Sequence, residues 1–285
     1  MTIRELLKYG EQLARAHGKE ESAVKRLLMH VLAMEGYEII LHFDQEVTKE
    51  EIERFQEGVH QYVFDHVPIQ YIIGHEYFYG YRFIVNPNVL IPRYETEELV
   101  GHVLRIYDEC FAGQIVDVVD VGTGSGAIAV TLALEEPNMR VDATDISENA
   151  LAVAKENAKA LNAKVHFMQG DLLEPLVKQG KRYDILVSNP PYIPNEEPVD
   201  PLVKDHEPHM ALFGGPDGMD FYERILKDAK KVLKPKSVIL FEHGWNQREK
   251  MERLIKQYFP HSTYEILKDM NQKDRITIIK NGLSG

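Results

Sequence analysis

The sequence contains little cysteine, few basic residues relative to acidic ones, and no long apolar run. Its 285 residues include one cysteine, so neither an intrachain disulfide nor a site built from several thiolates can form. Acidic residues number 45 and basic residues 33, and the formal net charge of −12 disfavours sequence-independent binding to a phosphate backbone. The longest apolar stretches, such as residues 237–241, are far shorter than the ~20 residues of a membrane-spanning helix.

The first residues also lack the features of a signal peptide. Residues 1–5 are MTIRE, which is charged at once and is not followed by an apolar core with a small-residue cleavage site. With 44% hydrophobic and 27% charged residues, the composition is that of an ordinary globular protein. We therefore expect a soluble, cytoplasmic protein.

Residues 1–75 are predicted to form a small helical domain. Apolar residues recur there at spacings of three, four and seven, as on one face of a helix, and Thr48 with Glu51 forms a capping-box pattern. The segment holds eight basic and 13 acidic residues, so it is not a basic DNA-binding arm. A simple helical bundle and a partner-binding domain are equally compatible with these features. No cluster of metal-ligand residues stands out, and we predict no metal site.

Residues 76–94 are predicted to link this domain to the rest of the chain. The segment 77–85 is rich in aromatic and β-branched residues, with Gly80 near its middle, which indicates a β-hairpin. From residue 95 to 285, strand-like runs alternate with helical patterns, which favours an α/β fold with a mostly parallel sheet covered on both faces. The last two runs are separated by a polar turn without a helix, so one strand should be antiparallel.

A ligand-binding loop is predicted directly after the first strand of this region. Residues 118–127 read VVDVGTGSGA, and glycines at alternate positions let the chain turn sharply into a helix while a ligand approaches without Cβ obstruction. The next strand ends in Asp145, where a carboxylate can accept hydrogen bonds from ribose hydroxyls. Because Gly122, Gly124 and Ala127 also satisfy the dinucleotide pattern G-x-G-x-x-A, the glycines alone leave the cofactor open.

A further candidate for the same ligand follows the third strand. The Asp171 carboxylate can accept a hydrogen bond from an adenine amino group, and Leu172 can pack against the ring. Taken alone, an aspartate at this position is more often a helix cap or a loop residue.

The chemistry is indicated by residues 189–192, Asn-Pro-Pro-Tyr, at the end of the fourth strand. Asn189 precedes a proline, which favours an extended conformation that aims its side chain along the strand direction. The two prolines have fixed φ and no N–H, so the Pro190 carbonyl can be held outward as an acceptor. Tyr192 offers a flat face to a planar group.

Together, the Asn189 side-chain oxygen and the Pro190 carbonyl oxygen can accept both hydrogens of a planar –NH2 group. An amide or aryl amine is a poor nucleophile because its lone pair is delocalised. Two fixed acceptors concentrate electron density on the nitrogen and orient its lone pair toward an electrophile, which is catalysis by position and electrostatics. This chemistry requires no strong general base.

These motifs resemble those of class I S-adenosylmethionine-dependent amino-methyltransferases. The stretches LIPRYETE at 90–97 and EPHMALFGG at 207–215 narrow the resemblance to the protein-(glutamine-N5) methyltransferases of peptide-chain release factors, the PrmC/HemK family. The resemblance covers essentially the whole chain. It implies a Rossmann-like, mostly parallel seven-stranded sheet with one antiparallel strand, and a helical domain at 1–75 that helps to recognise the release factor.

The resemblance also implies the reaction and the roles of individual residues. A methyl group passes from S-adenosylmethionine to the glutamine side-chain nitrogen of the Gly-Gly-Gln motif in class 1 release factors, leaving S-adenosylhomocysteine. Asp120 is the candidate partner of the cofactor's ammonium group, Asp145 of its ribose, and Asp171 of its adenine. The expected catalytic residues are Asn189, Pro190 and Tyr192, and the expected substrate-binding residues are these three and Pro191. The expected cofactor-binding residues are Asp120, Gly122, Thr123, Gly124, Ser125, Gly126, Asp145, Asp171, Leu172 and Asn189.

Two other functions use parts of the same pattern. An adenine-N6 nucleic-acid methyltransferase faces the same delocalised nitrogen, but it must extract its base and grip a phosphate backbone, and the acidic balance weighs against it. An NAD-dependent oxidoreductase uses a similar glycine turn but leaves residues 189–192 unexplained. We expect neither membrane binding nor direct nucleic-acid binding.

Overall fold

The computed structural model describes residues 1–283, which divide into two compact units. The first unit contains Met1–His75 together with Val199–His206, and the second contains Glu76–Pro198 and the described chain from Glu207 onward. The division predicted from the sequence, into 1–75, 76–94 and 95–285, does not include residues 199–206 in the first domain. Residues 199–206 fall in the first unit because Leu202 packs against its core and His206 Nε2 donates to the Asp65 carbonyl at 2.9 Å.

The first unit is helical. Thr48 and Glu51 form the predicted capping box, in which each side chain accepts a hydrogen bond from the other residue's backbone N–H. The amphipathic helices bury their apolar faces against one another around side chains such as Leu6, Val24 and Phe55, which are fully buried. The helices are α1 (Ile3–Ala16), α2 (Glu21–Leu32), α3 (Gly36–Leu41), α4 (Lys49–Val63), α5 (Ile69–Ile73) and the short α10 (Pro201–Lys204).

A small two-stranded sheet follows the first unit along the chain, with β1 (His75–Phe78) beginning at the boundary between the units and β2 (Tyr81–Ile84) within the second. Its turn residues Tyr79 and Gly80 both have positive φ, 52° and 79°, as a tight two-residue hairpin turn requires. Phe78 and Phe83 are buried in the core of this unit.

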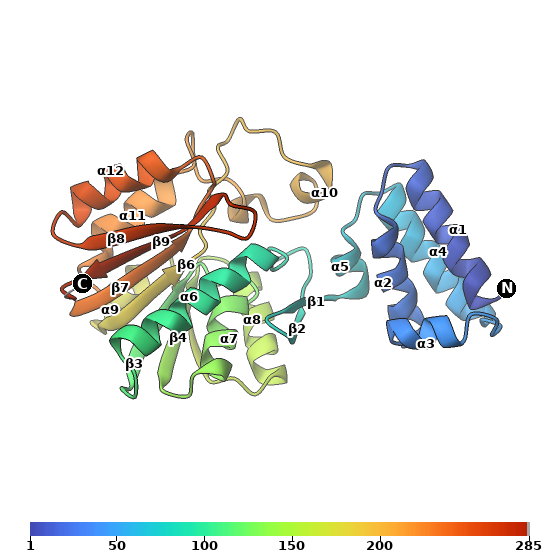
Figure 1. Ribbon diagram of the computed structural model, residues 1–285, viewed down its shortest axis with the longest axis horizontal. Coiled ribbons are helices and arrows are strands. Elements are labelled where there is room, and N and C mark those ends of the chain that lie inside the picture. The colour runs from blue at the N-terminus through green and yellow to red at the C-terminus, as the bar shows by residue number, and fades with distance from the viewer. Residues whose placement is uncertain (284–285) are drawn as a thin grey trace. The chain divides into compact units, whose positions relative to one another are not determined.

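A seven-stranded sheet forms the centre of the second unit, in the order β5-β4-β3-β6-β7-β9-β8 (Figure 1). All pairings are parallel except those of β9, which runs antiparallel to β7 and β8. The fold class predicted from the sequence, with its antiparallel strand, is confirmed. The strands are β3 (Val116–Val121), β4 (Met139–Asp145), β5 (Val165–Gln169), β6 (Tyr183–Ser188), β7 (Leu233–Glu242), β8 (Thr263–Lys268) and β9 (Asp274–Asn281).

Helices cover both faces of this sheet, as its nearly continuous apolar strands require. Successive residues of β3 point to opposite faces, so Val118 belongs to one core cluster and Val119 to the other. On the face of Val118 lie α6 (Tyr94–Cys110), α7 (Ala127–Glu135) and α8 (Glu148–Ala160); on the other lie α9 (Glu174–Gln179), α11 (Asp220–Ala229) and α12 (Arg248–Tyr258). Among residues 1–283, no helix is long and apolar enough to cross a membrane.

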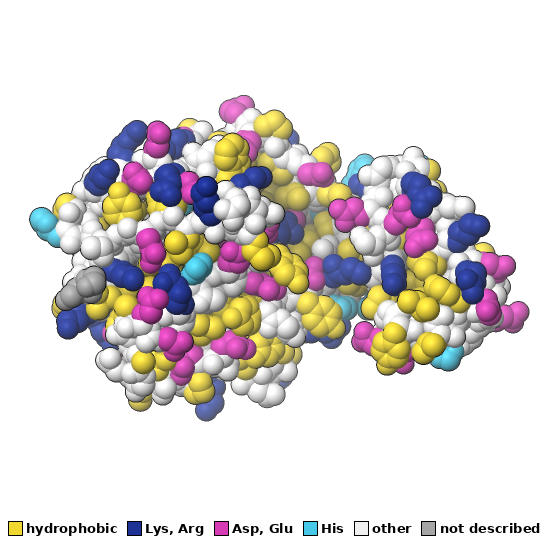
Figure 2. Space-filling view, viewed as in Figure 1, with side chains coloured by type: hydrophobic (Ala, Val, Ile, Leu, Met, Phe, Trp, Pro, Cys, Tyr) yellow, Lys and Arg dark blue, Asp and Glu magenta, His cyan; other side chains and the backbone are white. Residues whose placement is uncertain are grey.

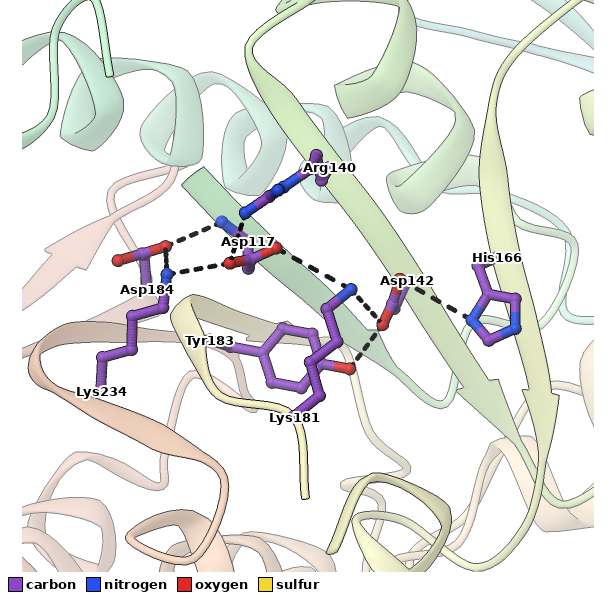
Figure 3. Close-up of polar contacts among 8 residues, drawn as sticks. All are labelled: Asp117, Arg140, Asp142, His166, Lys181, Tyr183, Asp184 and Lys234. Atoms are coloured by element: carbon purple, nitrogen blue, oxygen red, sulfur yellow. Dashed lines mark hydrogen bonds and ion pairs between the residues drawn. The ribbon is translucent and has the colours of Figure 1, made fainter. Parts of the chain in front are cut away.

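A network of ion pairs joins the amino-terminal halves of the parallel strands (Figure 3). The buried Asp117 carboxylate lies 2.9 Å from both Arg140 Nη2 and Lys234 Nζ, and Asp142 lies 2.8 Å from Lys181 Nζ. Burial alone would raise the pKa of Asp117, but Lys234 and Arg140 hold it below its ordinary value. Because the buried charges are paired, we interpret this network as structural. It lies toward the amino-terminal ends of the strands, whereas the predicted ligand site follows their carboxyl-terminal ends.

Candidate active site

The predicted ligand loop and the Asn-Pro-Pro-Tyr segment follow neighbouring strands, β3 and β6. The chain winds from β3 outward through β4 and β5, then crosses back to β6 and β7, so β3 and β6 flank the switch point where open α/β sheets bind ligands. Ser188, the last residue of β6, donates its hydroxyl to the Val121 carbonyl at the end of β3, at 2.5 Å. This bond holds the beginnings of the two segments together.

The glycine loop forms a cradle with open space on its ligand side. Gly122 and Gly124 have φ of 76° and 54°, and a Cβ added to either would meet no atom within 4 Å. The backbone N–H groups of Gly122 and Thr123 donate to the Thr144 carbonyl, which ties the loop to β4. The loop then enters α7 at Gly126, whose Cβ position lies 3.1 Å from Ala154 of α8. Only glycine meets these demands without strain.

Ser125 contributes to the conformation of the loop and does not face its open side. The Ser125 side chain is buried, and its carbonyl accepts a hydrogen bond from Asn157 Nδ2 of α8 at 2.9 Å. The same Asn157 amide bonds the backbone of Ile84, so the loop, α8 and the hairpin are fixed to one another.

Asp120 lies beneath the loop and is fully buried. Its Oδ2 accepts the Thr123 hydroxyl at 2.6 Å, whereas its Oδ1 is buried without a hydrogen-bond partner among the described residues. Burial, together with the smaller effect of the nearby Asp145 charge, raises the pKa of Asp120 to about 7. A cationic ligand group would stabilise the ionised carboxylate and satisfy its orphaned oxygen.

Asp145 stands at the end of β4, as predicted, and faces the glycine loop. Its Oδ2 accepts the Gly124 N–H at 2.8 Å, and its Oδ1 accepts the Ser147 N–H at 2.9 Å. Burial raises the pKa of Asp145, although these backbone donors act in the opposite direction. A carboxylate offers about four lone-pair sites, so after these backbone bonds Asp145 can position the loop and accept a ribose hydroxyl as well.

Asp171 and Leu172 follow β5 beside this edge of the sheet. Gly170 N–H donates to the Asp145 carbonyl at 2.9 Å, which aligns the two strand ends. The half-exposed Asp171 carboxylate forms an ion pair with Arg224 of α11 through Oδ2, which leaves Oδ1 for the predicted adenine contact. Leu172 has a positive φ of 50° and is held there by the Thr144 hydroxyl, which donates to its carbonyl at 3.0 Å.

Asn189 is oriented by residues from two other elements. Its Nδ2 donates to Thr96 Oγ1 of α6 at 3.1 Å, and the Thr96 hydroxyl in turn donates to Glu242 Oε2 of β7 at 2.7 Å. Thr96 and Glu242 are buried, with 5% and 2% of their surface exposed. The carboxamide nitrogen of Asn189 is therefore occupied.

The backbone of Pro191 and Tyr192, which follows Asn189, is held in place by Gln247 and by two close glycines. Gln247 Nε2 donates to the Tyr192 carbonyl at 2.8 Å, while Gln247 Oε1 accepts the Gly244 N–H. A Cβ on Gly214 would lie 2.4 Å from the Pro191 carbonyl oxygen, and one on Gly218 would lie 2.2 Å from that of Tyr192. Burial raises the pKa of the Tyr192 phenol well above its ordinary value, so the hydroxyl is neutral.

Three of these supporting residues were not predicted as site residues from the sequence: Thr96, Glu242 and Gln247. Thr96 lies within the LIPRYETE stretch and Glu242 ends an apolar strand, so the sequence indicated where each lies but not that it contacts the site. Gln247 lies in the turn before α12 and carried none. Their contacts span 55 to 146 residues of sequence, which local patterns do not reveal.

Comparison with known proteins gives a consistent result. Residues 5–74 match the PrmC N-terminal domain family, and residues 105–205 match the methyltransferase small domain family. The chain is 46% identical over 278 residues to the release factor glutamine methyltransferase of Bacillus cereus, covering 97% of this chain and 98% of that protein. It is 48% identical over 278 residues to the Bacillus subtilis protein of the same name, covering 96% of each. A methyltransferase structure from Pyrococcus furiosus shares the fold, with a TM-score of 0.50 and 17% identity over 82% of this chain and 99% of that one.

Proposed function

The chain belongs to the family of release factor glutamine methyltransferases, and we propose that it methylates the glutamine of the Gly-Gly-Gln motif in class 1 peptide-chain release factors. S-adenosylmethionine is the methyl donor, and the enzyme class predicted from the sequence is confirmed by these relatives. The observation that carries the proposal is the Asn189 carboxamide: its nitrogen is held by Thr96, which leaves its oxygen to accept from a planar amide.

The residues at the switch point fit S-adenosylmethionine. The open space over Gly122 and Gly124 accommodates the amino-acid part of the cofactor without a Cβ in its path. The orphaned Oδ1 of Asp120 suits an ammonium group, and Asp145 retains lone pairs for a ribose hydroxyl. Thr123, Ser125 and Gly126 shape the loop, while Asp171 and Leu172 lie beside the strand end where the adenine is expected.

Asn189 and Pro190 hold the glutamine side chain during the reaction. The Asn189 Oδ1 and the Pro190 carbonyl accept the two amide hydrogens, and Tyr192 provides the flat surface against which the amide lies, with Pro191 fixing the backbone between them. Accepting both hydrogens raises the electron density on nitrogen and directs its lone pair.

Bound S-adenosylmethionine supplies an electrophilic methyl group on a positively charged sulfur. With the cofactor bound, the glutamine nitrogen would form a bond to that carbon as the carbon–sulfur bond breaks, S-adenosylhomocysteine would leave, and the surplus proton on nitrogen would pass to water or a nearby acceptor. The Asn189–Pro190 pair stabilises the positive charge that develops on nitrogen, because both oxygens carry partial negative charge.

We assign recognition of the release factor to the first unit. Its helix α3 exposes three apolar side chains, Tyr37, Ile40 and Leu41, with 65%, 55% and 73% of their surface accessible. Contiguous exposed apolar residues typically mark a protein-binding surface. Basic side chains are interspersed with acidic ones on the visible face of each unit (Figure 2), which favours a protein substrate over a nucleic acid.

The proposal is tested by incubating the full chain with S-adenosylmethionine and a class 1 release factor, followed by mass spectrometry of the digest. We expect an increase of about 14 Da, one CH2 unit, on the Gly-Gly-Gln peptide, and none when the glutamine is replaced by alanine. A parallel reaction with duplex DNA tests the adenine-N6 alternative. Methylated adenine with an unmodified release factor would overturn the proposal.

A further inference from the structure

A chain of two hydrogen bonds fixes the Asn189 carboxamide from behind. Asn189 Nδ2 lies 3.1 Å from Thr96 Oγ1, and Thr96 Oγ1 lies 2.7 Å from Glu242 Oε2. The three residues come from the end of β6, the first turn of α6 and the end of β7, so three separate elements converge on one side chain. Because Thr96 and Glu242 are buried, water does not compete for these hydrogen bonds.

The direction of donation along this chain follows from the chemistry of the groups. A hydroxyl has one proton, and the Glu242 carboxylate in its ionised form can only accept, so in that form the Thr96 proton goes to Glu242. The Thr96 oxygen is then left to accept, and only the nitrogen of the Asn189 carboxamide can donate to it. A carboxamide turned over by 180° has nearly the same shape but would bring its oxygen against the Thr96 oxygen.

This directionality matters for the acceptor role of Asn189. The substrate amide presents –NH2, so it needs the oxygen of Asn189 and is repelled by its –NH2. An unfixed asparagine would spend part of its time in the wrong orientation, with donor facing donor. Resting on the proposed function, we propose that Thr96 and Glu242 are positioning residues that hold the Asn189 carboxamide with its oxygen toward the substrate.

The proposal is tested by a double-mutant cycle measured at pH 8, about one unit above the pKa of Glu242, where most of this carboxyl is ionised. Thr96→Val keeps the shape of the side chain but removes the hydroxyl, and we expect kcat on the release factor to fall about tenfold, the effect of one lost hydrogen bond. In an Asn189→Ala background the same substitution should change kcat by less than about twofold, because the group being positioned is gone. Thr96→Ser, which restores the hydroxyl, should recover activity to within about threefold of the parent protein.

A matched control separates positioning from loss of a buried hydroxyl in general. Thr277 of β9 is also fully buried, and its hydroxyl has no hydrogen-bond partner among the described residues. Thr277→Val should leave kcat unchanged. Equal losses of kcat for Thr96→Val in the parent and Asn189→Ala backgrounds would overturn the proposal, since they would show that Thr96 acts independently of Asn189.

A second measurement decides the matter without any substrate. The side-chain amide resonance of Asn189 is identified in the NMR spectrum of the full chain by its loss in Asn189→Ala. We expect this resonance to shift and its protons to exchange faster in Thr96→Val, and to be retained in Thr96→Ser. An unchanged resonance in Thr96→Val would overturn the positioning role, whereas a parent protein that leaves the release factor unmethylated would overturn only the proposed function.

Discussion

The Thr123 hydroxyl donates to Asp120 Oδ2 at 2.6 Å, while Asp120 Oδ1 is buried without a partner among residues 1–283. One oxygen of the carboxylate is thus used to close the glycine loop and the other is left for a ligand. Because an unsatisfied buried acceptor is costly, its persistence is typical of a functional site.

Binding of S-adenosylmethionine should depend on pH through Asp120. Burial raises the pKa of this carboxyl to about 7, and only its ionised form attracts the cofactor's ammonium. The ionised fraction grows about tenfold between pH 6 and pH 8, so we expect the Kd measured by calorimetry to fall about tenfold over that range. Asp120→Asn should bind weakly at both values. An identical pH dependence in the parent and the variant would contradict this role.

Asp145→Ala should weaken cofactor binding more than it slows methyl transfer. The substitution removes the proposed ribose acceptor and the acceptor of the Gly124 N–H, so the loop loses one of its bonds to β4 while those to the Thr144 carbonyl remain. We expect Kd for S-adenosylmethionine to rise about 10–100-fold, the loss of one or two hydrogen bonds to a charged acceptor. Asp228→Ala, at an ion-paired surface position of α11, serves as the control. An unchanged Kd for Asp145→Ala would count against the ribose assignment.

Asn189→Ala should separate binding from chemistry. It removes one of the two proposed acceptors for the substrate amide, so we expect kcat to fall on the order of 10²–10³-fold, as for other preorganised polar groups. Binding of S-adenosylmethionine should remain measurable by calorimetry. Turnover within a factor of about three of the parent protein would rule out the acceptor role.

The sequence predicts the fold and the centre of the site because both are encoded locally. The run from Val116 to Val121 is valine apart from Asp117 and Asp120, and the glycine-rich loop follows it at once, so strand, turn and ligand loop are all visible in one stretch. Asn189 and its prolines are likewise contiguous.

What the sequence could not predict depends on contacts between distant segments. The bond from Thr96 to Glu242 joins residues 146 positions apart, and neither residue type indicates a partner. The same holds for residues 199–206, which the predicted division includes in the domain 95–285, although Leu202 packs in the first unit. Such choices are made by tertiary packing, which periodicity does not record.

Replacing Glu242 by glutamine should change how stability depends on pH. Burial raises the pKa of Glu242 from 4.5 to about 7, so between these values the folded state binds more protons than the unfolded state. The group therefore lowers the free energy of unfolding as pH rises through this window. Glu242→Gln removes this dependence, and its stability relative to the parent should increase by up to about 3 kcal/mol from pH 4 to pH 8. Urea unfolding of both proteins at pH 4 and pH 8 measures this change. The same pH dependence of the free energy of unfolding in the parent and in Glu242→Gln would contradict the raised pKa of Glu242.

Gly218 lies under the active-site backbone, and its replacement should disturb catalysis as well as stability. Its φ is 78°, and an added Cβ would lie 2.2 Å from the Tyr192 carbonyl oxygen and 2.4 Å from Gln247 Nε2. Gly218→Ala must therefore displace the Tyr192 backbone and its bond to Gln247. We expect kcat to fall at least tenfold and the free energy of unfolding to drop by about 2–4 kcal/mol, from backbone strain together with overpacking.

Gly113 provides the matched control for this substitution. It has a similar φ of 74°, but a Cβ there would meet nothing within 4 Å. Gly113→Ala should therefore cost only the strain of the left-handed backbone, about 1 kcal/mol, and leave kcat unchanged. Equal losses of stability and turnover in the two variants would show that the close approach to Tyr192 has no part in the effect. Gly218 would then not support the backbone of the proposed substrate-binding residues.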